Sequence, residues 1–127
     1  MSGELELLKN YAVSKRRVGV QLSVLEDLTA LARRASKALP ETAAILTERV
    51  EVLEKKLTAE ITTLYAQIDQ AEILISQLEN PLWREVLERH YMQLEDFAEI
   101  AAAMHYSERH VRRMHRAALE KLTGSAL

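Results

Sequence analysis

The chain has 127 residues and a formal net charge of −2, with 48% hydrophobic and 28% charged residues. These proportions are typical of a globular protein and exclude a disordered or generally basic one. The sequence contains no cysteine, which excludes disulfide bonds and cysteine-ligated metal sites. With 3 glycines, 2 prolines and 5% aromatic residues, the chain favours helices over sheets almost throughout.

The first predicted element is a helix from about Glu4 to about Leu39. Its apolar residues recur at steps of three and four, which is the spacing of one helix face. They are Val18, Leu22, Leu25, Leu28, Ala32, Ala35 and Leu39. The segment before them, Met1 to Tyr11, is too acidic for a signal peptide. No stretch approaches the roughly 20 apolar residues that span a bilayer, so we expect no membrane partner.

The second predicted element, from about Glu41 to Glu79, follows Pro40 and has the spacing of a coiled-coil seam. An extra step of four between Leu57 and Ile61 interrupts the seam as a stutter. The seam residues are Leu46, Val50, Leu53, Leu57, Ile61, Leu64, Ile68, Ala71, Ile75 and Leu78. Because the connection near Pro40 is short, we expect the two helices to form an antiparallel hairpin.

Further apolar residues of the second helix lie off this seam, at Ile45, Val52, Tyr65 and Ile73. A hairpin of two helices buries only one stripe of each helix, so another surface must cover these residues. Either a second copy or the C-terminal part of the chain could do so. We predict that a second copy does, in a homodimer formed through the hairpin.

The last third of the chain opens with Asn80, a good helix cap, and Pro81, which suits a first helical turn. The expected inner face of this supporting helix is Leu82, Trp83, Val86, Leu87 and Tyr91. Asp96 and Glu99 have the spacing of a capping box and begin the next helix. The expected inner face of that helix is Phe97, Ile100, Ala101 and Met104. The small side chain of Ala101 allows two helices to approach closely.

A turn at His105, Tyr106 and Ser107 precedes the final helix, 107–122, which Ser107 is predicted to cap. Its expected inner face is Val111, Met114, Ala118 and Leu122. Its outward residues are Arg109, His110, Arg112, Arg113 and Arg116. From Ser107 to Lys121 there are five basic residues and two acidic ones, so this helix is locally positive. A narrow helix with arginines on its outer face fits the major groove of DNA.

The segment from Phe97 to Arg116 resembles the helix-turn-helix of bacterial and phage regulators, with Ala101, Val111 and Met114 at the matching positions. The longer segment from Tyr91 to Leu122 resembles region 4 of bacterial sigma factors. The matching pieces are Glu99-Ile100-Ala101, Tyr106-Ser107, Val111-Arg112-Arg113-Met114-His115 and Ala118-Leu119-Glu120-Lys121-Leu122. The chain departs from that family at two places where glycine is usual, namely His105 in the turn and Leu94-Glu95 before the middle helix.

The resemblance implies double-stranded DNA as a partner. Its recognition helix reads bases from the first two turns, which makes Glu108, Arg109, Arg112 and Arg113 the candidate base readers. Ser107, Arg116 and Lys121 are the candidate phosphate contacts, and His110 completes the predicted DNA-binding set. A hairpin followed by such a module is similar to small phage and prophage proteins. This implies a cytoplasmic transcription regulator, with RNA polymerase as a further candidate partner.

The histidines do not predict a metal site, because His110 and His115 are five residues apart and do not share a helix face. His115 is expected to be a partly covered surface residue or a phosphate donor. The sequence also shows no phosphate-binding loop, no nucleophile with a positioned base and no acidic metal cluster. We therefore expect neither an enzyme nor a protein that needs a cofactor.

The predicted architecture is all-α. Residues 1–79 form a coiled-coil hairpin that serves as an oligomerisation scaffold, and residues 80–127 form a three-helix DNA-binding module. Two alternatives stay open. A small terminase-like packaging subunit also combines a helix-turn-helix with helical oligomerisation, although such proteins usually carry the DNA module at the N-terminus. A coiled-coil adaptor that binds RNA polymerase is the other.

Overall fold

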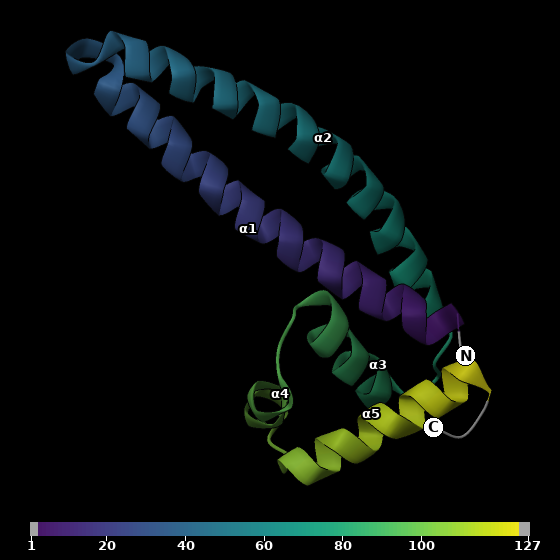
Figure 1. The fold of residues 1–127 in the computed structure, drawn as a ribbon. Helices are drawn as coiled ribbons and strands as arrows, with labels where there is room; N and C mark the ends of the chain where they lie inside the picture. The colour runs from purple at the N-terminus through teal and green to yellow at the C-terminus, as the bar shows by residue number, and fades with distance from the viewer. Residues whose placement is uncertain (1–2, 125–127) are drawn as a thin grey trace. The chain divides into compact units, whose positions relative to one another are not determined.

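A computed structural model describes residues 3–124 of the chain, and every regular element in that range is helical (Figure 1). The elements are α1 (Gly3–Ala38), α2 (Pro40–Ser76), α3 (Pro81–Leu87), the π-helix η1 (Glu88–Met92), α4 (Phe97–Met104) and α5 (Glu108–Thr123). This confirms the predicted all-α class. The outer ends of the two predicted regions, residues 1–2 and 125–127, lie outside the described residues.

The chain divides into two compact units. Residues 14–65 form the first unit, which contains most of α1 and α2. Residues up to 13 and from 66 onward form the second, which contains the remaining ends of those helices and all of α3, η1, α4 and α5. The boundary predicted near residue 80 remains a prediction.

The first unit is a helical hairpin whose two helices are joined by Leu39 alone. Helical hydrogen bonding continues on both sides of this joint. The Leu39 N–H donates to the Ala35 carbonyl at 2.8 Å, and the Ala43 N–H donates to the Leu39 carbonyl at 2.9 Å. Pro40 occupies the first position of α2, where its missing N–H costs no hydrogen bond. The predicted hairpin is therefore present, with the shortest joint that the sequence allowed.

The covered faces of the two hairpin helices follow the predicted spacing. Because one residue joins the helices, positions equally distant from Leu39 lie at the same level. The covered positions match on this basis, since Leu28 lies level with the buried Val50 and Leu25 lies level with the half-buried Leu53. With two exceptions on α1, the hairpin seam thus uses the residues that the periodicity selected.

Two residues predicted on this face of α1 are exposed instead, Leu22 at 38% and Leu39 at 59%. Leu39 lies beyond the helix end, in the joint. Next to Leu22, it is Gln21 that takes the central position, level with the buried Leu57. The Gln21 Oε1 and Glu60 Oε2 atoms are enclosed without a hydrogen-bond partner in the described part of the chain. Such polar atoms weaken a seam and disfavour other registers of the helices.

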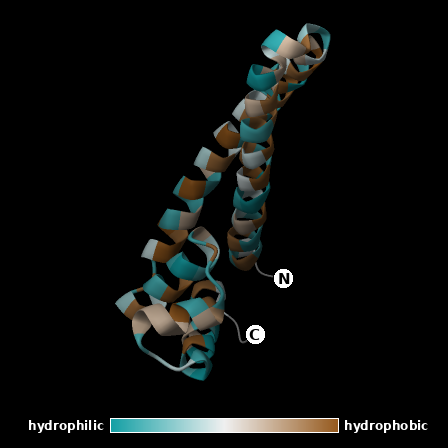
Figure 2. Cartoon of the chain, turned by 90° about the vertical axis from the view of Figure 1, so that its left-hand side faces the viewer, coloured by the Kyte–Doolittle hydropathy of each residue, from teal (hydrophilic) through white to brown (hydrophobic). Residues whose placement is uncertain are grey.

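The apolar residues predicted to lie off the seam of α2 are exposed. The exposed fractions are 63% for Ile45, 63% for Val52, 67% for Tyr65 and 63% for Ile73. Hydrophobic segments recur along the whole of both hairpin helices (Figure 2). No part of the described chain covers these four side chains fully. One copy of the chain therefore does not show which surface, if any, covers them.

The three-helix module packs around a core that the sequence largely identified. Val86, Ile100, Ala101, Val111 and Met114 are buried together, and Trp83, Phe97 and Met104 pack against them. Two predictions were imprecise, because Leu82 is 39% exposed and Leu122 is only half-buried. Leu119, which the sequence did not single out, is buried instead. The covered face of α5 is wider than one stripe because this helix packs against both α3 and α4.

Helix α2 ends at Ser76, three residues before the predicted end. The Gln77 and Leu78 N–H groups make tight bonds to the Leu74 and Ile75 carbonyls at 3.2 and 3.1 Å. Further along, Arg84 Nη1 donates to the carbonyls of Leu78 and Glu79 at 2.6 and 3.1 Å. A side chain of α3 therefore satisfies backbone groups that a longer helix would have used.

Candidate nucleic-acid interface

Helix α4 begins with the predicted capping box. The Asp96 side chain accepts a hydrogen bond from the Glu99 N–H at 2.8 Å, and the Glu99 side chain accepts one from the Asp96 N–H at 3.0 Å. Asn80 caps α3 in a similar way, with its Oδ1 accepting from the Leu82 N–H at 2.9 Å. These local bonds fix where both helices start. The first two helices of the module therefore begin where the sequence predicted.

The turn between α4 and α5 is left-handed at His105, where φ is 61° and ψ is 40°. The Tyr106 N–H reaches back to the Ala101 carbonyl at 3.1 Å, which closes the end of α4. Ser107 then caps α5, its Oγ accepting from the His110 N–H at 3.1 Å. The family's glycine position is thus left-handed here too, and histidine adopts that backbone at some cost.

The second departure from the family's glycines has the same structural outcome. Leu94, before α4, has a φ of 61°, which is the left-handed region that favours glycine. The surrounding loop is held in place from both sides. The Glu95 N–H donates to the Arg89 carbonyl at 2.9 Å, and the His90 ring nitrogen Nδ1 donates to the Glu95 carbonyl at 2.9 Å. These bonds oppose the strain at Leu94 and hold the loop before α4 in place.

The outer surface of α5 carries four exposed arginines. Together with Phe97 and His115 they line a hollow of about 470 Å³, and they are Arg109, Arg112, Arg113 and Arg116. Three of them, Arg109, Arg113 and Arg116, make no ion pair in the described part of the chain. Their guanidinium groups are therefore available to phosphate or to the edge of a guanine base.

Arg112 is held more firmly than its neighbours. Its Nη2 atom lies 2.8 Å from the Glu108 carboxylate oxygen Oε1, one helical turn earlier. Its guanidinium carbon also lies 4.6 Å from the centre of the Phe97 ring, within the range of a cation–π contact. Phe97 was predicted only as a core residue, yet it also supports an arginine of the outer surface. Arg112 is therefore preorganised before any ligand binds.

A packed cluster of rings lies beneath this surface and joins α5 to the rest of the module. The His115 Nε2 atom lies 2.8 Å from the Tyr91 hydroxyl. The His115 ring also lies 5.0 Å from that of Phe97, and the His90 ring stacks on Phe97 at 4.4 Å. Each of the elements η1, α4 and α5 contributes at least one ring, so the cluster fixes α5 relative to the supporting elements.

Burial determines the charge of this cluster. Desolvation, reinforced by the positive charges of His90, Arg112 and Lys9, lowers the pKa of His115 to about 4. Desolvation also raises the pKa of Tyr91 to about 12. At neutral pH the Tyr91 hydroxyl therefore donates to an uncharged imidazole. Of the two roles expected for His115, a partly covered residue fits this arrangement, whereas a charged phosphate donor does not.

The π-helix η1 places two of these rings and has no signal in the sequence. Its wide turn is closed by the Gln93 N–H, which donates to the Glu88 carbonyl at 2.9 Å. Within it Arg89 pairs with Glu85 at 2.8 Å and with Glu95 at 3.2 Å. Such a wide turn adds a residue within a helix and changes the direction of the side chains that follow.

The structure brings together only part of the predicted DNA-binding set. Ser107, Glu108 and the four arginines lie on the first two and a half turns of α5 or at its cap. His110 is half-buried, and its ring leans on that of Tyr106 at 4.8 Å. Lys121 is exposed in the last turn and, at roughly 100° per residue, points away from the arginine surface. Tyr106, 39% exposed beside the cap, was not in the predicted set.

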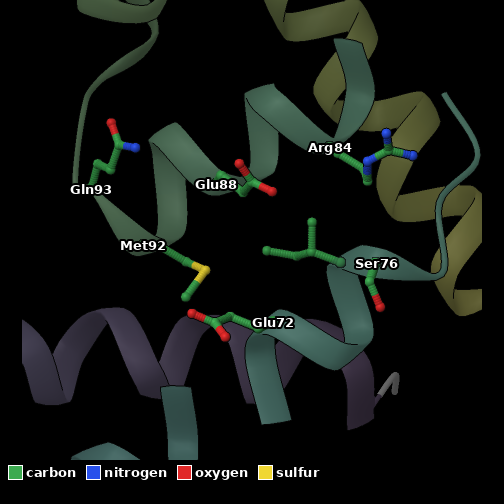
Figure 3. Close-up of a pocket in the computed structure, with 7 residues that line it drawn as sticks. Glu72, Ser76, Arg84, Glu88, Met92 and Gln93 are labelled. Carbon is green, nitrogen blue, oxygen red and sulfur yellow. The ribbon is translucent and has the colours of Figure 1, made fainter. Parts of the chain in front are cut away.

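A second hollow, of about 550 Å³, lies between the end of α2 and the elements α3 and η1. Figure 3 shows Glu72 and Ser76 on one wall and Glu88, Met92 and Gln93 on the other. Its charges are mixed, because Arg84 lies near the two glutamates, and it does not favour an anionic ligand. No group of three potential metal ligands occurs among residues 3–124. In that same range no helix is both long and apolar enough to cross a membrane.

A comparison with curated proteins and another with solved structures gave no match. A comparison with protein families gave the model described as Sigma-70, region 4, which matches residues 80–123. The match begins at the cap of α3 and ends with α5, so it covers the three-helix module and leaves the hairpin outside. It confirms the resemblance found from the sequence and extends it by one helix toward the N-terminus. Residues 80–123 are thus a sigma-70 region 4 domain, a DNA-binding domain of the helix-turn-helix type.

Proposed function

We propose that the protein regulates transcription by binding double-stranded DNA sequence-specifically, with α5 in the major groove. The observation that carries this proposal is the arginine surface of α5, where three guanidinium groups make no ion pair within residues 3–124 and a fourth is preorganised. The B-DNA major groove, about 12 Å wide, admits one helix. The closed turn and the caps of α4 and α5 would present that helix as a rigid element.

The four arginines suggest different roles. Arg109 and Arg113 lie one turn apart on the same side of α5, near its start, where a recognition helix meets base edges. Together with Arg112 and Glu108 they are the proposed base readers. Arg116 lies further along the helix, and with Ser107 it is the proposed phosphate contact. Lys121 lies away from this surface, so we expect its contribution to be small.

RNA polymerase is a second candidate partner, because the matching family is named for a region of sigma factors. An adaptor of this kind would bind the polymerase without using the arginine surface. Polymerase binding that survives the loss of Arg112 and Arg113, with no DNA affinity in the intact protein, would favour that alternative. The order of a hairpin followed by the module supports a regulator of phage or prophage type. No feature of the site calls for catalysis or a cofactor.

We also propose that the protein acts as a homodimer formed through the hairpin. The exposed apolar residues of α2 are the observation behind this proposal. A dimer would offer two recognition helices, which could occupy two half-sites on one duplex and raise specificity.

The function is tested by selecting bound duplexes from a random DNA pool and then titrating the winners at two salt concentrations. We expect an enriched motif whose affinity falls as salt rises, because arginine–phosphate contacts release counterions. A motif with two-fold symmetry would support the dimer as well. Failure to enrich any sequence, with no retention of DNA at low salt, would rule out the DNA-binding proposal.

A further inference from the structure

Arg112 differs from the other arginines of α5 because a ring from another helix supports it. Its guanidinium carbon lies 4.6 Å from the centre of the ring of Phe97, the first residue of α4. Its Nη2 atom donates to Glu108 Oε1 at 2.8 Å, within α5 itself. The first contact joins the two helices of the helix-turn-helix, whereas the second restrains Arg112 along its own helix. The orientation of this guanidinium group therefore depends on where α4 begins.

The Phe97 ring is held in place independently of Arg112. The His90 ring stacks on it at 4.4 Å with an angle of 12° between the planes, and the His115 ring meets it at a steep angle at 5.0 Å. Phe97 also packs against the core of the module and directly follows Asp96, the cap of α4. The ring is thus a fixed platform, and Arg112 is the group that adapts to it.

Arg112 remains accessible although it is held. Its side chain is 59% exposed, and it lines the same hollow as Phe97 and the other arginines. Apart from the bond to Glu108, its N–H groups have no acceptor within residues 3–124. A guanidinium group is planar and carries five N–H donors in a fixed fork. A ring that holds the plane therefore also sets the directions in which the remaining donors point.

The neighbouring arginines have no such support in the described part of the chain. Arg109, Arg113 and Arg116 make no ion pair there, and no ring lies beneath their guanidinium groups. Each must lose side-chain freedom when it binds, a cost that Arg112 has largely met already. Phosphate accepts hydrogen bonds from many directions, but guanine O6 and N7 require a correctly oriented fork. The difference between the arginines therefore affects base recognition more than phosphate binding.

We propose that Phe97 is a positioning residue that makes Arg112 the specificity-determining arginine of the DNA site, with guanine as the base that Arg112 contacts. Phe97 acts through the guanidinium plane of Arg112 and does not itself need to touch DNA. This role rests on the proposed function. It ranks Arg112 above Arg109 and Arg113 among the proposed base readers.

The positioning role is tested by titrating the full chain with the selected duplex and with duplexes changed at one base pair. The wild type should discriminate against the loss of one G·C pair. Arg112→Lys should lose this discrimination, because lysine keeps the charge but has no planar fork. Phe97→Leu should reduce the same discrimination on the order of tenfold, because it removes the cation–π contact and leaves an apolar side chain in the core. Phe97→Tyr keeps the ring and should behave like the wild type.

The matched control is Trp83→Leu. Trp83 packs against the same core as Phe97 but does not line the hollow of the arginines. We expect this variant to keep the wild-type discrimination at every base pair, and circular dichroism verifies that each variant is helical. The combination of Phe97→Leu with Arg112→Lys should discriminate no worse than Arg112→Lys alone, because the two substitutions remove the same interaction.

The pattern of losses decides the role of Phe97. Full discrimination in Phe97→Leu would show that Arg112 needs no ring. An equal loss of affinity for every duplex would place Arg112 on phosphate instead of a base. A Phe97→Tyr variant as impaired as Phe97→Leu would show that the ring face does not hold the guanidinium group. Each of these results overturns the proposed positioning.

A measurement without DNA separates this role from the proposed function. In nuclear magnetic resonance spectra of the free chain, the Phe97 ring should shift the side-chain protons of Arg112 upfield relative to those of Arg113. Phe97→Leu should remove that shift. A wild type that selects no duplex removes the proposed function and the specificity of Arg112 with it, while the shift still decides whether Phe97 positions Arg112. A wild type that selects a duplex but shows no shift overturns the positioning alone.

Discussion

The hairpin and the module are both purely helical, but different kinds of interaction specify them. The hairpin consists of two helices of 36 and 37 residues. Apolar spacing and a one-residue joint define it, and the hydroxyl groups of Thr29, Thr47 and Thr58 merely bond to their own helices. The module has short helices, and each is fixed by a cap, a left-handed residue or a ring contact. A regular apolar spacing is enough to specify the hairpin, whereas the module depends on individual contacts at particular residues.

The difference between the two regions predicts that the loss of one core side chain destabilises the module more than the hairpin. Replacement of the fully buried Ile100 by alanine should destabilise the module by about 2–5 kcal/mol, because it leaves a cavity in a small core. Leu53→Ala, at a half-buried hairpin position, should cost less. Urea unfolding monitored by circular dichroism for each variant checks this. Equal losses would mean that the hairpin is packed as specifically as the module.

The second prediction separates the recognition surface from the scaffold. Arg112→Ala together with Arg113→Ala should reduce affinity for the selected duplex by on the order of a hundredfold or more, since each base contact contributes about 1–3 kcal/mol. Helicity and sedimentation should be unchanged. Titration of the selected duplex against a scrambled one measures the loss. If the double variant unfolds, these arginines have been assigned to the wrong face of α5.

The third prediction concerns acid. The pKa of His115 is lowered to about 4 in the folded module, against roughly 6.5 in an unfolded chain. The unfolded state therefore binds a proton first, so this contribution to stability is complete above pH 6.5 and is lost as the pH falls toward 4. We expect a loss on the order of 1 kcal/mol, after allowing for the part of the ring that solvent reaches.

Thermal melts of the wild type and of His115→Gln between pH 7 and pH 4 measure this effect. The variant should be less stable at pH 7 but should lose less stability on acidification. A variant with the same pH dependence as the wild type would show that other groups control the acid response.

The smallest predicted effect lies in the turn. His105→Gly should stabilise the module by about 0.5–1 kcal/mol, because glycine adopts a φ of 61° without a steric cost. His105→Ala serves as the control and should not stabilise, since alanine keeps the β-carbon. Denaturant midpoints of both variants at equal m-values decide the matter. A destabilising His105→Gly would point to a contact of the imidazole that outweighs the backbone strain.

The sequence was most informative where interactions are local. The Asp96 capping box, the Ser107 cap and the hairpin seam all follow from residues a few positions apart, and all are present. The two places where the family usually has glycine, at His105 and at Leu94-Glu95, each contain a left-handed residue. Contacts between distant residues gave no such signal. Tyr91 and His115 are 24 residues apart, and their hydrogen bond depends on a π-helix that no sequence motif predicts.

The same distinction explains the recognition surface. Helical spacing placed the arginines on the outer face of α5, but it could not separate Arg112 from the others. That difference comes from Phe97, whose ring lies at the start of another helix. By contrast, Lys121 was selected for its charge, although the helical spacing from Arg116 already places it away from the arginines.

The single-residue joint at Leu39 restricts how the hairpin can evolve. An insertion in one helix alone shifts every level beyond it, which brings Gln21 and Leu57 out of step. Matched insertions in both helices, each close to a whole number of helical turns such as seven residues, preserve the seam. Descendants of this chain, natural or engineered, should therefore change the length of both hairpin helices together, while the joint itself keeps its length.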